Sequence, residues 1–552
     1  MGPPVQHSAC KRKETALPDL DLLQLDRMVE ALLSPWSAAP GPGATVGIVR
    51  EGELVVHRSA GLASIEHGVP IGPETRFRIA SVSKQFTTAA VLMLEHEGRL
   101  GLEDPAARHL PEFNLDPRIT VAHLTHNTSG IRDMLEIMRQ GGADLGVPVT
   151  SQALLDGIAR QRGLNFEPGS RFLYSNSNFL LLGEIVERLT GQKLEFFLER
   201  RIFQPLGMSR TAMTPDMQAV IPSLATGYRP TNGSWARAQH AFPLHGEGGL
   251  VSCVPDLALW DRNLETGRVG GDWLASALAR QTPFSNGTTN RYARGQVVRD
   301  YRGLRTISHG GLWPGYRTEF LRVPDRRTTV IAISNAANLD PNALAHSVLD
   351  AVLDGDPAVI PVPPLPERAV LAPLAGRYLD PSGPATADLV VPEDGPPTIV
   401  LYGLKTALEA LDDGRVGAAR ANAVWAMHPA GPDAIEVEQD AGAVSVWHRV
   451  QPGAPMPDGL PGQYRSEEMA TTWTVSADAE GGLQVVASGP VVTGPAWRIE
   501  PIEGDVIRVH VPGTLWPAWL DVRVERTADG TPAALLVNGG RVRGARYTRT
   551  TS

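Results

Sequence analysis

The sequence predicts an α/β domain followed by two small antiparallel β-barrels. Residues 21–355 mix apolar residues at helical and at strand spacing. Residues 356–370, DPAVIPVPPLPERAV, contain five prolines and are typical of a linker. The remaining chain consists of short β-rich runs separated by glycine, aspartate and proline. Because 552 residues are too many for one hydrophobic core, we expect several domains.

The elements of residues 21–355 are predicted in chain order from their apolar spacing. DLLQLDRMVEALL is typical of a helix, and ATVGIVREGELVVHRSAGLA is typical of a β-hairpin with its turn at Glu51-Gly52. SNFLLLGEIVERLTG predicts a helix that stops at Gly191. RTTVIAISN indicates a buried strand, and NALAHSVLDAVLDG a terminal helix. Strands near both ends with helices between them predict a sheet flanked by helices.

The C-terminal part contains two modules of similar pattern. LAGRY at 374–378 matches LPGQY at 460–464, and each opens a stretch that ends in a strand with an aromatic residue, Trp447 or Tyr547. Such a repeat favours two β-rich units of the same topology. The two predicted barrel domains cover residues 371–452 and 453–552.

Composition excludes several classes of function. The net charge is −9 and there is no basic block, so we expect no nucleic-acid partner. Two cysteines rule out a disulfide framework and a cysteine-rich metal site, and we expect neither a metal nor another cofactor. Residues 1–20 are predicted to be a loose leader without the apolar region of a secretory signal. No run reaches the ~18 apolar residues of a membrane span, so we expect a cytoplasmic protein that does not bind membranes.

One of only five lysines lies in the segment SVSK, directly before an apolar stretch. At i, i+3 spacing on a helix, Ser81 and Lys84 share a face. Burial disfavours an ammonium group, and a lysine whose pKa falls toward neutrality can take a proton from a serine hydroxyl. The backbone N–H of Ser81 at the helix start could also stabilise an oxyanion. The motif alone is weak, because Ser8 and Lys11 show the same spacing in the leader.

A second motif, FEPGSRFLYSNSNF, places Tyr174 and Asn176 in a polar loop before an amphipathic helix. The Tyr174 phenol could relay a proton if a nearby cation lowered its pKa. The Asn176 amide could hold Lys84 and a substrate amide oxygen together. The alternative is that Tyr174 is a half-buried aromatic residue and Asn176 a helix cap.

A third motif, ISHGGLWPGYRTEF, places His309, Gly310 and Gly311 at the end of a predicted strand. Two glycines allow a ligand to approach the backbone closely. The N–H of Leu312 could then complete an oxyanion hole opposite that of Ser81. The alternative is a simple turn between two strands.

The three motifs follow one another in the order S-x-x-K, Y-x-N and H-x-G. With them the chain resembles the penicillin-recognising serine hydrolases, which include class C β-lactamases, serine D,D-peptidases, esterases and D-aminopeptidases. SVSKQFT, FEPGSRFLYSNSNF, HLTHNTSGI, ERRIFQPLGM and HGG, with two barrels after the catalytic domain, resemble the D-aminopeptidases most. This resemblance implies a serine β-lactamase/D,D-peptidase-like catalytic domain, a small peptide or amide substrate, and a homodimer.

The resemblance also implies roles for individual residues. Ser81 would be the nucleophile, Lys84 the general acid/base and Tyr174 its proton partner, whereas Asn176 and His309 would line the substrate site. Where relatives often have a lysine in the third motif, this chain has His309, which is mostly neutral at pH 7 and a weak anchor for a carboxylate. That difference favours an aminopeptidase over a carboxypeptidase.

The substrate is the open question. In D-aminopeptidases a loop of the last barrel carries an aspartate for the substrate amine, but the corresponding segment RVHVPGTLWPAW contains no acid. Tryptophans there could face an ammonium group or pack the barrel. Glu247 could be a substitute acid, although an exposed loop glutamate is the simpler expectation. RVRGARYTR near the end is expected to be an exposed strand face. The candidate specificity residues of the loop are Thr514, Trp516 and Trp519.

Three functions are therefore considered. The leading hypothesis is a serine hydrolase that releases N-terminal D-amino acids from peptides, amides or esters through an acyl-enzyme on Ser81. An esterase, an amidase or a D,D-peptidase/β-lactamase-like hydrolase would use the same chemistry on other substrates. A non-catalytic binding protein on this fold is the alternative from another class.

Overall fold

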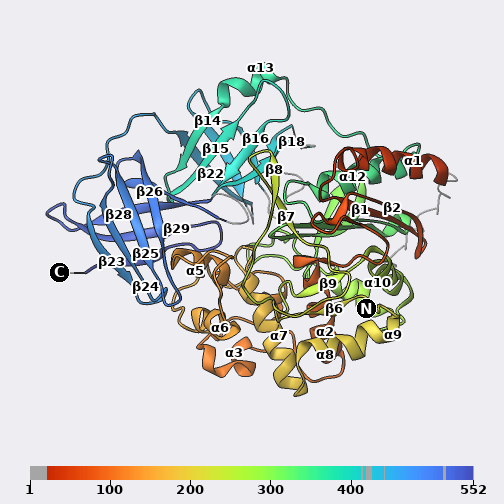
Figure 1. The fold of residues 1–552 in the computed structure, drawn as a ribbon. Helices are drawn as coiled ribbons and strands as arrows, with labels where there is room; N and C mark the ends of the chain where they lie inside the picture. The colour runs from red at the N-terminus through yellow and green to blue at the C-terminus, as the bar shows by residue number, and fades with distance from the viewer. Residues whose placement is uncertain (1–20, 412–413, 418–424, 440–441, 514–517, 551–552) are drawn as a thin grey trace, which may run out of the picture.

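A six-stranded antiparallel sheet lies at the centre of the N-terminal part of the computed structural model (Figure 1). The structure describes residues 21–411, 414–417, 425–439, 442–513 and 518–550. Strands from opposite ends of this part pair along their whole length: β1 (Ala44–Arg50) lies next to β13 (Thr328–Ser334). The order across the sheet is β10 (Val297–Tyr301), β11 (Leu304–Trp313), β12 (Tyr316–Val323), β13 (Thr328–Ser334), β1 (Ala44–Arg50) and β2 (Glu53–Ala60).

Helices cover both faces of this sheet, as the sequence predicts. On one face, α1 (Leu22–Leu33) and α12 (Pro341–Val352) share an apolar cluster with β1 and β13. On the other face, α10 (Val254–Thr266) packs on β1 and β13. The predicted hairpin is also present, since β1 and β2 are joined by Glu51 and Gly52 with φ of 53° and 78°.

A helical region lies beside the sheet and contains α2 (Lys84–His96) and α7 (Asn176–Thr190), which pack against each other. Every residue from Lys84 to Leu94 is buried, so α2 is a core helix. The α7 helix ends at Gly191 as predicted, where a φ of 68° places the glycine in the left-handed region. Among the helices of the described segments, none has the length and hydropathy needed to cross a bilayer.

Short elements connect these parts. The helical ones are η1 (Ser34–Trp36), η2 (Ala80–Ser83), α3 (Ala106–His109), η3 (Pro111–Phe113), α4 (Val121–Thr125), α5 (Met134–Gln140), α6 (Ser151–Ala159), α8 (Leu194–Leu198), η4 (Glu199–Phe203), α9 (Gln204–Leu206), α11 (Trp273–Leu278), η5 (Pro324–Arg326), α13 (Arg368–Leu371) and η6 (Ala372–Leu374). The short strands are β3 (Leu62–Ser64), β4 (Val69–Pro70), β5 (Phe77–Arg78), β6 (Ala212–Met213), β7 (Tyr228–Thr231), β8 (Ser234–Arg237) and β9 (Leu250–Ser252).

The first C-terminal module is a nine-stranded antiparallel sheet in the order β17-β16-β15-β14-β22-β21-β20-β19-β18. Its two edge strands, β17 and β18, are separated by Leu408 alone, so the sheet curls until its edges meet and is barrel-like. Its strands are β14 (Gly376–Asp380), β15 (Ala385–Val390), β16 (Thr398–Leu401), β17 (Leu404–Ala407), β18 (Glu409–Ala410), β19 (Val416–Gly417), β20 (Trp425–Pro429), β21 (Ala434–Gln439) and β22 (Ala443–Arg449).

The second C-terminal module is a closed eight-stranded barrel around its own apolar core. Each strand pairs with the next one along the chain, and the first strand pairs with the last. The strands are β23 (Gly462–Ser466), β24 (Thr471–Ala477), β25 (Leu483–Ser488), β26 (Thr493–Glu503), β27 (Val506–Val511), β28 (Ala518–Arg526), β29 (Pro532–Asn538) and β30 (Ala545–Arg549).

The LAGRY and LPGQY segments adopt the same structure in the two modules. Tyr378 donates its hydroxyl to the Leu374 carbonyl at 2.8 Å, and its strand partner is Arg449. Tyr464 repeats both features with the Leu460 carbonyl, also at 2.8 Å, and with Arg549 as partner. In each case the arginine guanidinium also covers the tyrosine ring, at 5.2 and 5.6 Å. The repeat seen in the sequence is therefore a repeat of three-dimensional structure.

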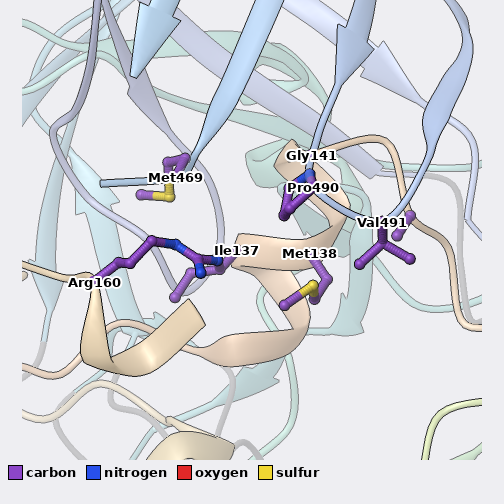
Figure 2. A pocket seen from close by; sticks show the side chains of 8 residues that line it. Ile137, Met138, Gly141, Arg160, Met469, Pro490 and Val491 are labelled. Carbon is purple, nitrogen blue, oxygen red and sulfur yellow. The ribbon is translucent and has the colours of Figure 1, made fainter. Parts of the chain in front are cut away.

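The closed barrel rests on α5 of the N-terminal part (Figure 2). Figure 2 shows Ile137 and Met138 on α5 facing barrel residues that include Met469 and Pro490. The cavity between them measures about 10 Å³, which is at the lower limit of the space that a single water molecule needs. At the end of α5, the Gln140 carbonyl accepts a hydrogen bond from the Trp473 indole at 2.9 Å. The barrel is thus packed tightly against the helix.

Candidate active site

Ser81 lies in the short helix η2, immediately before α2. The residue before it, Ala80, has a φ of 47° in the left-handed region, which is uncommon for an alanine. The Lys84 ammonium donates to Ser81 Oγ at 3.1 Å, as the i, i+3 spacing predicts. The strained turn and the following helix together present the serine hydroxyl to the lysine.

Lys84 has three hydrogen-bond acceptors and no exposed surface. Besides Ser81 Oγ, its Nζ contacts Asn176 Oδ1 at 2.9 Å and the Glu247 carbonyl at 2.5 Å. Burial lowers the pKa of Lys84 to about 7. The Glu247 carboxyl acts to raise this pKa, and the Arg541 cation lowers it further. A lysine with this pKa is partly neutral near pH 7 and can accept the serine proton.

Tyr174 lies beside Ser81, whose hydroxyl acts to lower the pKa of the Tyr174 phenol. The Lys84 Nζ lies 4.9 Å from the centroid of the Tyr174 ring. Burial raises the pKa of Tyr174, and Arg541 offsets this only in part. The expectation that a cation lowers this pKa is therefore wrong in its net direction, because desolvation exceeds the attraction of the cation. Tyr174 remains a neutral phenol that can pass a proton on by accepting one and donating another.

The orientation of Asn176 is fixed by Asp133, at the start of α5. Asp133 Oδ2 accepts hydrogen bonds from the backbone N and from Nδ2 of Asn176 at 2.7 and 3.0 Å. Since a carboxylate can only accept from the amide NH2, the Asn176 carbonyl oxygen must face Lys84. Asp133 Oδ1 meanwhile caps α5 through Leu135 N and Glu136 N. Sequence motifs gave no signal for Asp133.

We expect Asp133→Asn to lower kcat about tenfold, because a buried donor would then face the donors of Asn176. The change is measured as kcat on any substrate that the wild-type protein turns over. Asp340→Asn is the matched control, since Asp340 caps α12 through the same two kinds of bond but lies outside the site. Equal effects of the two substitutions would contradict the role of Asp133 in positioning Asn176.

His309 is buried and held by two neighbours. Its Nδ1 lies 2.6 Å from the Gly310 carbonyl, which can only accept, so Nδ1 carries the proton. Nε2 then accepts from the hydroxyl of Tyr292 at 3.0 Å. Burial, with a smaller contribution from Lys84, lowers the pKa of His309 to about 3. The residue is neutral at pH 7, in line with the expectation that it is a weak anchor for a carboxylate.

Gly311 brings β11 against the segment that leads to Ser81. A Cβ atom at Gly311 would lie 2.2 Å from the Ile79 carbonyl oxygen, so only glycine fits. This close approach brings β11, which includes Leu312, against η2, which includes Ser81. Gly310 differs, since a Cβ there would lie 3.0 Å from the side-chain oxygen of Glu319.

Glu247 is buried, with 2% of its surface exposed, so the expectation of an exposed loop glutamate is wrong. Its carboxylate accepts from the His245 backbone N at 3.1 and 3.2 Å, and burial raises its pKa. Thr87 donates to the Gly246 carbonyl at 2.7 Å and fixes the same loop. Glu247 thus contacts Lys84 in two ways. Its carboxyl group acts to raise the pKa of Lys84, and its backbone carbonyl accepts a hydrogen bond from the Lys84 amine.

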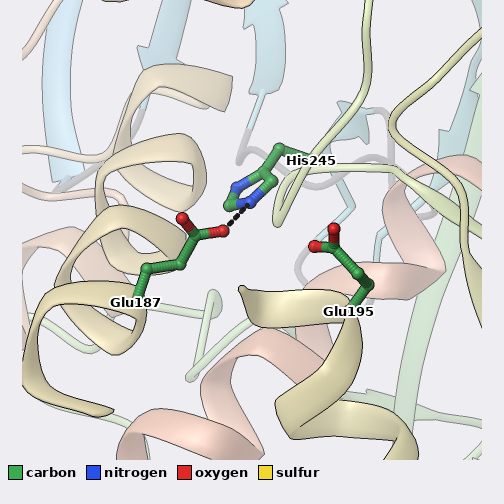
Figure 3. Close-up of side chains that lie close together, drawn as sticks. All are labelled: Glu187, Glu195 and His245. Carbon is green, nitrogen blue, oxygen red and sulfur yellow. Dashed lines mark hydrogen bonds and ion pairs between the residues drawn. The ribbon is translucent and has the colours of Figure 1, made fainter. Parts of the chain in front are cut away.

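Figure 3 shows His245 from this loop facing Glu187 on α7 and Glu195 on α8. Potential ligand atoms of these three side chains lie within 4.8 Å of one another. Among the described residues, this is the cluster whose geometry could hold a metal ion. His245 Nε2 is 2.9 Å from Glu187 Oε1, and Lys193 and the Leu194 N–H also bind Glu187. Because protein groups already bind Glu187, we interpret this residue as structural. It fixes His245, and thereby the loop whose Glu247 carbonyl contacts Lys84.

The candidate specificity loop is described only in part. Thr514 and Trp516 lie outside the described residues. Trp519 is in β28, and the Arg508 guanidinium covers its ring at 3.8 Å. Arg508 in turn binds Asp388 of the nine-stranded sheet at 3.0 Å. Trp519 therefore packs at the contact between the two C-terminal modules, and its part in specificity stays a prediction.

A different turn of the barrel reaches the site. Between β29 and β30, the Arg541 guanidinium lies 4.7 Å from the centroid of the Tyr174 ring. Its Nη1 is 3.7 Å from Asp133 Oδ2, and its backbone N donates to Glu136 at 2.8 Å. The expectation that RVRGARYTR is an exposed strand face is wrong for Arg541, because this residue belongs to the turn and points toward the catalytic domain.

The structure thus brings Ser81, Lys84, Tyr174, Asn176 and His309 together from three distant segments. A model of the Beta-lactamase family matches residues 26–353. The chain belongs to this family. Comparison with structures agrees with a Beta-lactamase-family catalytic domain followed by barrel-like sheets, so the predicted fold class is confirmed.

Curated relatives of this Beta-lactamase-family chain include several D-aminopeptidases. The one from Gluconobacter oxydans (strain 621H) is 30% identical over 363 residues, which cover 64% of this chain and 66% of the relative. The one from Brucella anthropi is 32% identical over 299 residues, covering 53% and 56%. The one from Brucella ovis is 31% identical over 369 residues, covering 66% and 68%. The chain thus spans 66% and 56% of the lengths of the first two relatives.

Solved structures similar to this chain share its fold. An octameric penicillin-binding protein homologue from Pyrococcus abyssi has a TM-score of 0.54 at 21% identity and covers 78% of this chain and all of its own. The D-amino acid amidase from Ochrobactrum anthropi SV3 with D-phenylalanine has a TM-score of 0.51 at 23% identity, covering 61% and 98%. At these identities the likeness shows the fold alone, and the predicted homodimer stays a prediction.

Proposed function

We propose that this chain is a serine hydrolase that releases N-terminal D-amino acids from peptides, amides or esters. The observation that supports this most is the contact between Ser81 Oγ and Lys84, a buried amine whose pKa is about 7. Burying a lysine costs free energy of folding. Because groups with strongly shifted pKa values cluster at functional sites, the burial of Lys84 favours a catalytic role. The D-aminopeptidase relatives support the substrate class.

In the proposed acylation step, Ser81 Oγ bonds to the acyl carbon and its proton passes to Lys84 Nζ. The N–H groups of Ser81 and Leu312 hold the oxyanion that forms. Lys84 returns a proton through the Tyr174 hydroxyl to the leaving nitrogen, and the bond between that nitrogen and the acyl carbon breaks. The products of this step are a free amine and an ester on Ser81.

In the proposed deacylation step, water attacks the ester carbon while Lys84 takes a proton from it. The bond between Ser81 Oγ and the acyl carbon then breaks, and Lys84 returns the proton to Ser81 Oγ. The acid is released and the resting site is restored. No other group is consumed, so the cycle is balanced.

Labelling with a serine-reactive fluorophosphonate, read by intact-protein mass spectrometry, tests the nucleophile. We expect one adduct on the wild-type protein and none on Ser81→Ala. Ser8→Ala, which removes the serine of the second S-x-x-K pattern, is the matched control and should keep the adduct. Absence of any adduct, or an adduct that Ser81→Ala leaves unaffected, would contradict the role of Ser81 and favour a non-catalytic binding protein.

Substrate class is tested with D-alanine p-nitroanilide, its N-acetylated form and a p-nitrophenyl ester. An aminopeptidase prefers the free amine, and we expect the D form to be hydrolysed faster than the L form. Preference for the acetylated substrate or for the ester would instead favour the D,D-peptidase or esterase alternative.

A further inference from the structure

Arg541 is a cation at the edge of the candidate active site whose contacts are a long ion pair with Asp133 and the ring of Tyr174. The Arg541 side chain is 31% exposed, and within the described segments its guanidinium forms no hydrogen bond. The nearest carboxylate, Asp133, lies 3.7 Å away, beyond hydrogen-bond distance. Both Asp133 oxygens already accept two N–H donors each. Five guanidinium N–H donors are therefore available to another acceptor.

The position of Arg541 is fixed by the barrel. Its backbone N donates to Glu136 Oε2 at 2.8 Å, and the Arg543 N donates to Asn165 at 2.7 Å. Both acceptors belong to the catalytic domain, so the turn is attached to it on either side of Val542. The guanidinium lies over the Tyr174 ring and is close enough to act electrostatically on Lys84 and Tyr292. A preorganised arginine of this kind suits a carboxylate, which it can bind through two parallel bonds.

We propose that Arg541 binds a carboxylate on the leaving-group side of the substrate, so that the preferred substrates are short peptides whose amine product carries a free C-terminal carboxylate. This inference rests on the proposed function, in which Tyr174 delivers the proton to the leaving nitrogen. Since Arg541 covers the Tyr174 ring, it lies on the side from which the amine departs. His309 is neutral and engaged at both nitrogens, so it does not supply this charge.

The inference changes what the last barrel contributes. The segment 508–519 contains no acid for a substrate amine, whereas the β29–β30 turn brings a cation to the site. A cation favours an anionic product over an amide-terminated one. We therefore expect a dipeptidase-like preference: D-alanyl-glycine over D-alanyl-glycinamide.

The test compares kcat/KM on D-alanyl-glycine and on D-alanyl-glycinamide for wild type, Arg541→Ala and Arg541→Lys. We expect the wild-type ratio to favour the free carboxylate, and Arg541→Ala to reduce that ratio roughly 10- to 100-fold, the usual range for a charge-assisted hydrogen bond. Arg541→Lys should retain part of the preference. The ratio is insensitive to a change in Lys84 basicity, because such a change affects both substrates equally.

Arg546→Ala is the matched control, since Arg546 lies on β30 of the same hairpin, is 53% exposed and pairs with Glu525. It should leave the ratio unchanged. A wild-type ratio near one, or a ratio that Arg541→Ala does not alter, would overturn the inference while hydrolysis itself upheld the proposed function. Absence of hydrolysis of both peptides would count against the proposed function instead.

Two further measurements keep the outcomes separate. Binding of the two peptides to Ser81→Ala by calorimetry reports the carboxylate preference without turnover, so the inference remains testable if hydrolysis fails. D-aspartyl and D-asparaginyl p-nitroanilides place the charge on the acyl side. If the Arg541-dependent preference appears with that pair and not with the dipeptides, the leaving-group assignment is wrong.

Discussion

Replacing Lys84 by methionine should lower kcat by roughly 10²–10⁴, the usual contribution of a positioned proton transfer. Methionine is similar in length to lysine and keeps the buried position apolar, but it cannot accept a proton from Ser81 Oγ. It also leaves Asn176 Oδ1 and the Glu247 carbonyl without their donor. The fluorophosphonate adduct should form correspondingly more slowly.

The pH dependence distinguishes loss of a base from general damage. Only neutral Lys84 accepts a proton, and its pKa is about 7, below the usual 10.5. The wild-type kcat/KM should therefore rise about tenfold per pH unit well below pH 7 and level off above it. Lys84→Met should lose this rise. Lys405→Met, at an exposed position on β17, is the control and should keep the wild-type profile. Unchanged turnover in Lys84→Met would refute the role of the lysine.

Replacing Gly311 by alanine should lower kcat by roughly 10²–10³, the cost of losing one oxyanion donor. The new Cβ would meet the Ile79 carbonyl oxygen at 2.2 Å, and a backbone atom cannot move aside as a side chain can. We expect β11 to shift away from η2 and to withdraw the Leu312 N–H from Ser81. KM for a small substrate should change less than kcat.

Gly310→Ala provides a control one residue away. Its Cβ would lie 3.0 Å from Glu319 Oε2, the end of a flexible side chain on the other face of the strand. We expect little change in kcat and a modest change in the melting temperature. If both alanine variants lost activity equally, distortion of the sheet rather than the Leu312 N–H would explain the loss.

Sequence spacing predicted the contacts that lie within one helix or one strand. Ser81 and Lys84 meet because three residues along a helix restore the same face, and β1 and β2 meet because Glu51-Gly52 forms a tight turn. The apolar stretch after Lys84 likewise predicted its burial. These features depend on local geometry alone.

Residues that reach the site from elsewhere left no such signal. Asp133 looks like an ordinary helix cap in sequence, and only its second oxygen, which holds Asn176, gives it a role in the site. Glu247 stands between glycines and is typical of an exposed loop, yet the loop is fixed beneath Lys84. Tyr292 contacts His309 through tertiary packing, which the spacing of these residues in the sequence does not predict.

Arg541 shows most clearly why the polar composition of a segment can mislead. Five of the nine residues in RVRGARYTR are arginine or threonine, a composition that is typical of a solvated strand face. The strand β30 begins only at Ala545, so the first arginines belong to the preceding turn, whose direction depends on tertiary packing. Two catalytic-domain acceptors, Glu136 and Asn165, decide that direction.

The seven-residue helix α5 joins two parts of the molecule that have different tasks. At its start Asp133 orients the amide of Asn176, and at its end Gln140 is held by Trp473 and Tyr547 of the barrel. The helix is about 10 Å long and behaves as a short strut. A fragment pared down to the hydrolase domain would lose the far support of this strut as well as Arg541. We therefore expect that removing or exchanging the C-terminal barrel would disturb the position of Asn176 at the other end of α5.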